Sequence, residues 1–137
     1  MKVFLDTNIL FSGSQSGSRM RALLDCLQNH ATLTTHPGVL EEARRNLSAK
    51  KPDWIASFDS LCTHLTISTR MGPCPVTDLA PKDQPVLAAA VASGADRLVT
   101  GDRCHFGSLY GKTIHSIHVC STRQLAKEMR DLGWLKK

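Results

Sequence analysis

Residues 83–102 read DQPVLAAAVASGADRLVTGD, and this stretch decides the fold. Pro85 suits the first turn of a helix, an apolar stripe at helical spacing follows it, and Gly94 ends the helix. Residues 97–100 then form a short apolar run typical of a buried strand, which closes at Asp102. A helix followed at once by a buried strand is the repeating unit of a parallel sheet.

The same alternation extends outward through the whole chain. We predict strands over residues 2–5, 31–34, 65–68, 97–100 and 114–120. We predict helices over residues 19–29 and 37–49, another opening at Pro52, the one beginning after Asp83, and a final one that Ser121 and Gln124 start as a capping box. Short strands that alternate with longer helices predict a three-layer α/β domain with a central parallel sheet, and the 137 residues suit a single domain, residues 1–137.

The composition excludes several classes of protein. Apolar residues make up 42% and charged residues 21%, which is ordinary globular usage rather than that of a disordered or fibrous chain. No stretch approaches the ~20 apolar residues of a membrane span, and no secretory signal is expected. Five irregularly spaced cysteines without a CxxC motif fit a reducing cytoplasm better than a disulfide framework or a zinc site. A net charge of +5 makes an anionic partner plausible.

Two predicted strands end in an aspartate. Asp6 follows the first strand, and Asp102 follows the fourth. In open parallel sheets the functional crevice lies beyond the carboxyl ends of the strands, so neighbouring strands would bring both carboxylates into one crevice. The alternative is that each aspartate only caps a loop, where Asp is common.

Two further acids lie where they would border that crevice. At about 100° per residue, Glu42 falls at the margin of the apolar stripe of its helix, and Glu41 falls nearer to solvent. An ion pair of Glu42 with Arg44 or Arg45 is the alternative. Asp83 precedes a helix, so a role as N-cap competes with a role in the site, and both can hold together. Asp96 reads as part of a turn.

Carboxylates that converge on one spot repel one another unless cations neutralise them. A ligand set of oxygens without Cys or His favours Mg²⁺ or Mn²⁺. Such ions polarise phosphoryl oxygens and activate water, so hydrolysis of a phosphodiester is the reaction that this set predicts. If four of the twelve acidic residues converge, the 17 basic residues face only eight others, which leaves an acidic site in a basic surface.

Four segments, taken in order, resemble the PIN-domain nucleases, above all the small bacterial and archaeal toxins of toxin-antitoxin pairs. They are FLDTNI (residues 4–9), VLEEARRNL (residues 39–47), KDQPVLAAAVASGADRLVTGD (residues 82–102) and DRCHF (residues 102–106). Each motif alone is weak, but the ordered set is specific, and the resemblance spans about residues 2–120.

The resemblance implies a Rossmann-like α/β/α PIN domain that cuts RNA with Mg²⁺ or Mn²⁺. Carried over to this chain, the family's four acids fall on Asp6, Glu42, Asp83 and Asp102, which would be both the catalytic and the metal-binding residues. Asn8 and Thr100 match positions that orient carboxylates or water in the family. The family also implies an antitoxin protein as partner and a tendency to form homodimers.

Other functions compete with this hypothesis. A PIN-like module that binds RNA or protein without cutting is the main alternative, although the complete acidic set argues against it. A metal-dependent phosphatase of small phosphate esters is a third hypothesis, but an enzyme of the haloacid-dehalogenase type would have DxD after its first strand, where this chain has Asp6-Thr7-Asn8. Ser12, Ser14 and Cys104 lack the partners of a covalent nucleophile, and His105 is expected to be structural. Only 5% of residues are aromatic, so the RNA backbone would supply most of the affinity.

The last predicted helix has two interpretations. Arg123, Lys127 and Arg130 line up as a phosphate path in one of them, and they form an ordinary solvated face in the other, which we favour. Beyond residue 120 the resemblance no longer guides the choice.

Overall fold

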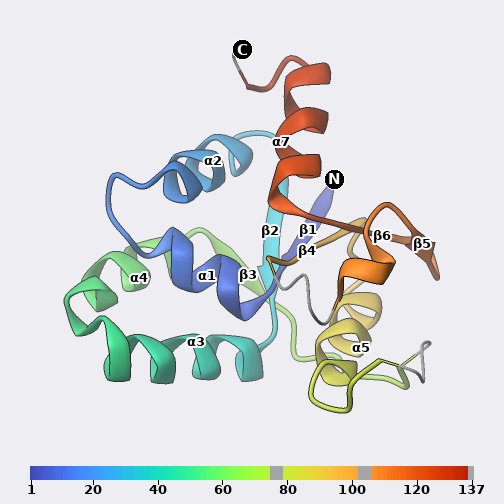
Figure 1. Cartoon of the computed structure of the whole chain (residues 1–137), viewed down its shortest axis with the longest axis horizontal. Helices are drawn as coiled ribbons and strands as arrows, with labels where there is room; N and C mark the ends of the chain where they lie inside the picture. Colours follow the sequence, from blue (N-terminus) through green and yellow to red (C-terminus); the bar gives the residue numbers. More distant parts are fainter. Residues whose placement is uncertain (75–78, 102–105, 136–137) are drawn as a thin grey trace.

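A computed structural model describes residues 1–74, 79–101 and 106–135 of the chain (Figure 1). Strands and helices alternate along it, as the sequence predicts. The strands are β1 (Lys2–Leu5), β2 (Thr32–Thr35), β3 (Leu65–Ile67), β4 (Arg97–Val99), β5 (Thr113–Ile114) and β6 (Ile117–Cys120). The helices are α1 (Thr7–Gly13), α2 (Arg19–Leu27), α3 (Pro37–Lys50), α4 (Ile55–Cys62), α5 (Gln84–Ala92) and α7 (Thr122–Asp131), with 3₁₀ turns η1 (Pro52–Trp54) and η2 (Gly107–Leu109).

The strands form one sheet in the order β3-β2-β1-β4-β6-β5. β1 lies in its middle and pairs in parallel with both β2 and β4. The chain builds outward from β1 to β3, then returns to the other side of β1 for β4 and β6. This reversal makes the boundary between β1 and β4 the topological switch point, where open α/β sheets form their crevice.

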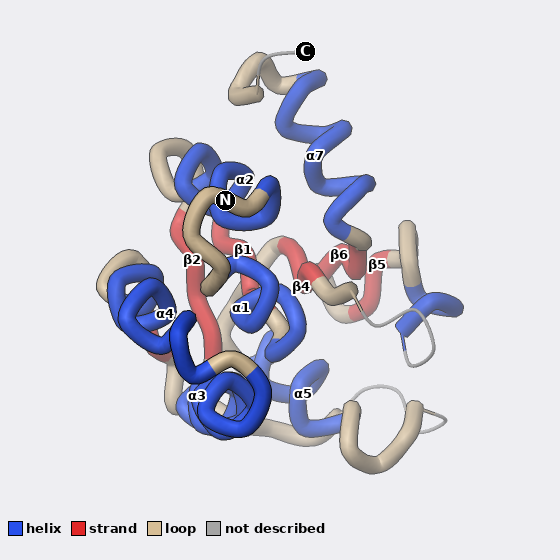
Figure 2. Tube along the Cα trace, turned by 60° about the vertical axis from the view of Figure 1, so that its left-hand side comes forward, coloured by secondary structure: helices blue, strands red, loops and turns tan. Residues whose placement is uncertain are grey.

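Helices cover both faces of this sheet. Right-handed crossovers put the helices between β1, β2 and β3 on one face, and α5, which leads back to β4, on the other. Figure 1 shows α1 to α4 on one side of β1 and β2 and α5 on the other; in the turned view of Figure 2, α3 is seen end-on, with α5 next to it in projection. A strand enclosed in this way must be apolar on both sides, and Val3, Phe4 and Leu5 of β1 are all 0% exposed. The predicted three-layer α/β fold with a mostly parallel sheet is confirmed.

Helix α5 buries a run of four consecutive residues. Leu87, Ala88, Ala89 and Ala90 are all buried, and their small side chains let the helix backbone approach the sheet closely. Its 9 residues extend only about 14 Å. Throughout the described part of the chain, every helix is too short or too polar to traverse a bilayer.

Two local features differ from the sequence expectation. Helix α1 was not predicted: it begins directly at Thr7, whose amide donates to the Asp6 carboxylate at 2.7 Å, so Asp6 caps a helix rather than a loop. The strand predicted over residues 114–120 is a hairpin of β5 and β6, because His115 and Ser116 adopt positive φ angles of 47° and 70° and turn the chain back. Such turns usually contain Asn or Gly, so the dipeptide His-Ser did not indicate a hairpin.

Helix α7 buries Leu125 and Met129 and leaves its basic residues on the other side. The predicted capping box of Ser121 and Gln124 is present. Arg97 of β4 donates two hydrogen bonds to the Glu128 carboxylate, at 3.1 and 2.6 Å, which tie the helix to the sheet. Lys127 pairs with Asp131 on the exposed face, in keeping with the solvated-face interpretation.

Candidate functional site

The candidate site lies at the carboxyl end of β1, at the switch point of the sheet. Asp6 follows β1 directly and caps α1, and its backbone amide donates to the Val99 carbonyl of β4 at 3.2 Å. Its position is therefore set by both strands at once. The carboxylate is almost fully buried, with 6% of the residue exposed.

Two donors orient the Asp6 carboxylate. The Thr7 amide donates to one oxygen at 2.7 Å, and the Thr100 hydroxyl donates to the other at 2.8 Å. Burial raises the pKa of Asp6, these two hydrogen bonds lower it, and the negative charges of Glu42 and Asp83 raise it again, with a net upward shift. The Asp6 carboxylate is therefore fixed in orientation, and its ionised form is destabilised unless a cation lies nearby.

Glu42 reaches the site from the second wall of the crevice, helix α3. Its carboxylate accepts a hydrogen bond from the Thr7 hydroxyl at 3.4 Å, so Thr7 touches both Asp6 and Glu42. The alternative ion pair does not form, since Arg44 pairs with Asp59 and Arg45 pairs with Glu41. Glu42 itself is exposed, whereas the sequence placed it at the margin of the buried face.

Asp83 enters the same space from α5. It occupies the N-cap position of that helix, yet its side chain makes no capping hydrogen bond, and the residue is 7% exposed. The alternative, in which the carboxylate only caps the helix, therefore does not account for its position. The predicted fourth acid, Asp102, lies outside the described residues, as do Cys104 and His105.

Thr100 and Gly101, which follow β4, are held by hydrogen bonds to Asp6, Asn8 and Tyr110. Thr100 is 0% exposed, and its carbonyl accepts from the Tyr110 hydroxyl at 2.9 Å. The Gly101 amide donates to the Asn8 side chain at 3.0 Å. Asn8 and Thr100, which the resemblance suggested as orienting residues, thus both link the ends of β1 and β4.

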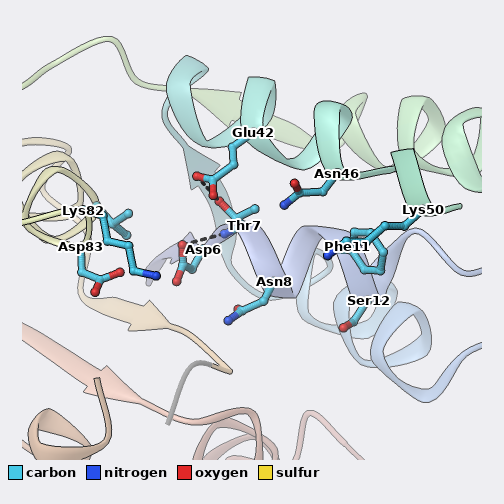
Figure 3. Close-up of a pocket in the computed structure, with 11 residues that line it drawn as sticks. Asp6, Thr7, Asn8, Phe11, Ser12, Glu42, Asn46, Lys50, Lys82 and Asp83 are labelled. Atoms are coloured by element: carbon cyan, nitrogen blue, oxygen red, sulfur yellow. Dashed lines mark hydrogen bonds between the residues drawn. The ribbon is translucent and has the colours of Figure 1, made fainter. Parts of the chain in front are cut away.

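These acids line one cavity of about 390 Å³, which Figure 3 shows in close-up. Asp6, Glu42 and Asp83 face a shared space, and the Lys82 side chain extends toward it. Sequence reasoning missed several further lining residues: Thr7, Phe11, Asn46, Lys50, Lys82 and Val86. A signal for two of them was available, because Asn46 and Lys50 follow Glu42 at successive intervals of four, on one face of α3.

The donor set suits a hard divalent cation. All three described acids offer oxygen, the ligand that Mg²⁺ and Mn²⁺ prefer. Burial is the main cause of the raised pKa of Asp6, the charges of Glu42 and Asp83 add to it, and a cation beside the carboxylate would offset both. Within the described ranges, no three Asp, Glu, His or Cys side chains form a group close enough to hold an ion by themselves. The three acids therefore surround the cavity rather than meet at one point.

Other residues considered from the sequence have structural contacts. The Asp96 carboxylate accepts from the Lys2 amide at 2.7 Å and fastens the turn before β4 to β1. Ser14 is 0% exposed, and its hydroxyl donates to the Leu10 carbonyl within the same helical segment. Ser12 does line the cavity, but its carbonyl is the atom that accepts a hydrogen bond, from Ser18. Among the described residues, the hydrogen bonds of Ser12 and Ser14 include no base that would activate either hydroxyl.

Fold and cavity together define a class: a Rossmann-like α/β domain with buried acids at its switch point. A family model described as PIN domain matches residues 2–104, and the chain belongs to that family. Among solved structures, it is similar to a chain in the crystal structure of VapBC2 from Rickettsia felis bound to a DNA fragment from their promoter. The TM-score is 0.65 at 20% identity, over 88% of this chain and 98% of the other. A comparison with curated proteins finds no match to this chain.

Proposed function

We propose that the protein is an endoribonuclease that depends on Mg²⁺ or Mn²⁺ and hydrolyses phosphodiester bonds of RNA. The observation that carries this proposal is the buried Asp6 carboxylate, which shares one cavity with Glu42 and Asp83. Two of these acids, Asp6 and Asp83, are buried, and burying ionised carboxylates near one another costs free energy that a bound cation offsets.

The four acids Asp6, Glu42, Asp83 and Asp102 would hold the metal, directly or through water. A divalent ion bound there supplies Lewis-acid polarisation of the phosphoryl group and a more acidic water at neutral pH. The role of the protein chain is to hold these carboxylates in a fixed orientation. Thr7 and Thr100 fix both oxygens of Asp6 by hydrogen bonds, so this carboxylate does not need to reorganise when substrate arrives.

The charge distribution favours a polyanionic substrate. The chain carries a net charge of +5, although several of its acids face the cavity. Lys50 and Lys82 line that cavity beside the acids and offer ammonium groups to substrate phosphates. A small phosphate ester would use few of these charges, whereas an RNA strand passes several phosphates over them.

We further propose that the protein is the toxin of a toxin-antitoxin pair and acts in the cytoplasm as one domain. Its similarity to a chain of VapBC2 supports this proposal. An antitoxin protein is then the expected partner, and a homodimer is the expected assembly. Co-expression with the product of an adjacent open reading frame, followed by size-exclusion chromatography, tests both.

The decisive experiment measures cleavage of a panel of labelled single-stranded RNAs with Mg²⁺, with Mn²⁺ and with EDTA. We expect cleavage that requires the metal and is lost in Asp6→Asn, Asp102→Asn and Glu42→Gln. Glu41→Gln is the matched control, because Glu41 is the adjacent residue of the same helix, pairs with Arg45 and lies outside the cavity. RNA that binds but stays intact with every metal contradicts the nuclease and supports a module that binds without cutting.

A further inference from the structure

The cavity continues beyond the acids along the groove between α1 and α3. Glu42, Asn46 and Lys50 all line it and follow one another at intervals of four residues, so one face of α3 forms a wall. At 1.5 Å per residue, Lys50 lies about 12 Å from Glu42 along the helix axis. Along this wall the side chains change from an acid to an amide to a cation.

The opposite wall offers an aromatic ring. Phe11 of α1 lines the cavity and is partly exposed, and Figure 3 shows it on the same side of Thr7 as Asn46 and Lys50. The Trp54 ring contacts Phe11 edge-on, with centroids 5.6 Å apart and planes at 60°. The Phe11 ring is therefore packed against a second aromatic ring.

Lys50 lines this arm of the cavity and, unlike the two arginines of α3, has no acidic partner among the described residues. Arg44 and Arg45 pair with Asp59 and Glu41, and the Lys51 ammonium lies 5.3 Å from the centre of the Trp54 ring. Considering the residues that the structure describes, Lys50 forms no ion pair. An unpaired cation in a groove attracts an anion.

We propose that this arm of the cavity, formed by Phe11, Asn46 and Lys50, binds one unpaired nucleotide of the RNA strand next to the cleaved phosphate. The base packs on the Phe11 ring and meets the Asn46 amide, and the next phosphate along the strand contacts the Lys50 ammonium. Aromatic rings stack on any base, whereas an amide offers both donors and an acceptor to a base edge. The inference rests on the proposed function, since it assumes that the RNA phosphate beside the cavity acids is the one that is cleaved.

The shape of the cavity restricts the substrate to unpaired RNA. Its volume of about 390 Å³ lies in the range of pockets that take small ligands, so it has room for a nucleotide but not for a duplex. Bases inside an A-form helix are stacked on one another, and only loops, bulges and single strands can present one to a recessed ring.

Binding in EDTA tests the subsite without cleavage. Fluorescence anisotropy measures the affinity of a labelled single-stranded RNA for the wild type, Phe11→Leu, Lys50→Ala and Lys112→Ala. Lys112 is exposed and outside the cavity, so the last variant is a control with the same charge change. We expect Lys50→Ala to make the slope of log affinity against log salt shallower by about 0.7, the value for one phosphate contact on a single strand, and Lys112→Ala to leave it unchanged.

A thermodynamic cycle tests the stacked base. In a series of RNAs that each lack one base, we expect a single position at which the loss of the base weakens wild-type affinity about tenfold. Phe11→Leu should bind the complete RNA more weakly than the wild type does, and its affinity should not fall further when the base at that position is missing. Circular dichroism checks that Phe11→Leu is folded, and the salt slope of Lys50→Ala stands independently of that variant.

The outcomes separate this inference from the proposed function. Coupling between Phe11 and one base, with or without cleavage, supports the subsite. Cleavage without that coupling, or equal salt slopes for Lys50→Ala and Lys112→Ala, overturns the subsite and leaves the nuclease intact. Equal binding of a fully paired duplex overturns the restriction to unpaired RNA, and no RNA binding at all overturns both proposals.

Discussion

Replacement of Thr100 by valine isolates the hydrogen bond that holds the Asp6 carboxylate. Valine keeps the shape of threonine and the backbone contacts of Thr100 with Cys120 and Tyr110, but it removes the hydroxyl that donates to Asp6 at 2.8 Å. A hydrogen bond to a charged group is worth about 2 kcal/mol, so we expect the free energy of unfolding at pH 7 to fall by about that amount.

The pH dependence of this loss is the specific signature. Asp6 has a raised pKa in the folded protein, so its burial is least costly below the unfolded pKa, and stability declines as pH rises through the folded pKa. Loss of the Thr100 hydroxyl raises the pKa of Asp6 further. The difference between wild type and variant should therefore be small near pH 4 and grow toward pH 8.

Urea unfolding in EDTA, followed by tryptophan fluorescence at several pH values, measures this difference. The matched control is Thr34→Val, since Thr34 is 1% exposed and its hydroxyl donates to the neutral Thr66 carbonyl at 2.7 Å. That variant should lose about 1 kcal/mol at every pH. If Thr100→Val shows the same flat loss as the control, the Thr100 hydroxyl does not act on the Asp6 charge and the reasoning fails.

Other predictions concern the frame around the site. Glu128→Gln breaks the pair with Arg97 and should cost about 1 kcal/mol at pH 7. Because Arg97 lowers the pKa of Glu128 in the folded protein, urea titrations should show this cost in full above about pH 4.3, the ordinary pKa of Glu, and declining as pH falls through the lower folded pKa. Gly94→Ala should lower stability by about 1 kcal/mol, since Gly94 has a φ of +74°, whereas Gly107→Ala meets no atom within 4 Å and should cost less. Burial raises the pKa of Cys120 to about 12, so iodoacetamide followed by peptide mass spectrometry should modify this thiol only after unfolding.

Long periodic elements were predictable because their patterns repeat. Helix α3 was predicted over residues 37–49 and ends at Lys50, since Pro37 marks its start and its apolar stripe is long enough to show a period. The 7 residues of α1 are too few for such a period, and a capping aspartate looks the same in sequence as one that closes a turn. The β5–β6 hairpin was not predicted, because its turn depends on positive φ angles at His115 and Ser116, and neither residue type indicates such an angle in the sequence.

The layered α/β class and the candidate acids could be predicted from the sequence, because hydrophobic periodicity and the residues at strand ends are local properties. The surroundings of these acids depend on tertiary contacts. Thr7 between Asp6 and Glu42, the missing cap at Asp83 and the Phe11–Lys50 arm all depend on which helices face each other across the switch point. Contacts between residues far apart in the chain follow from sheet order and crossover handedness, which no short stretch of sequence encodes.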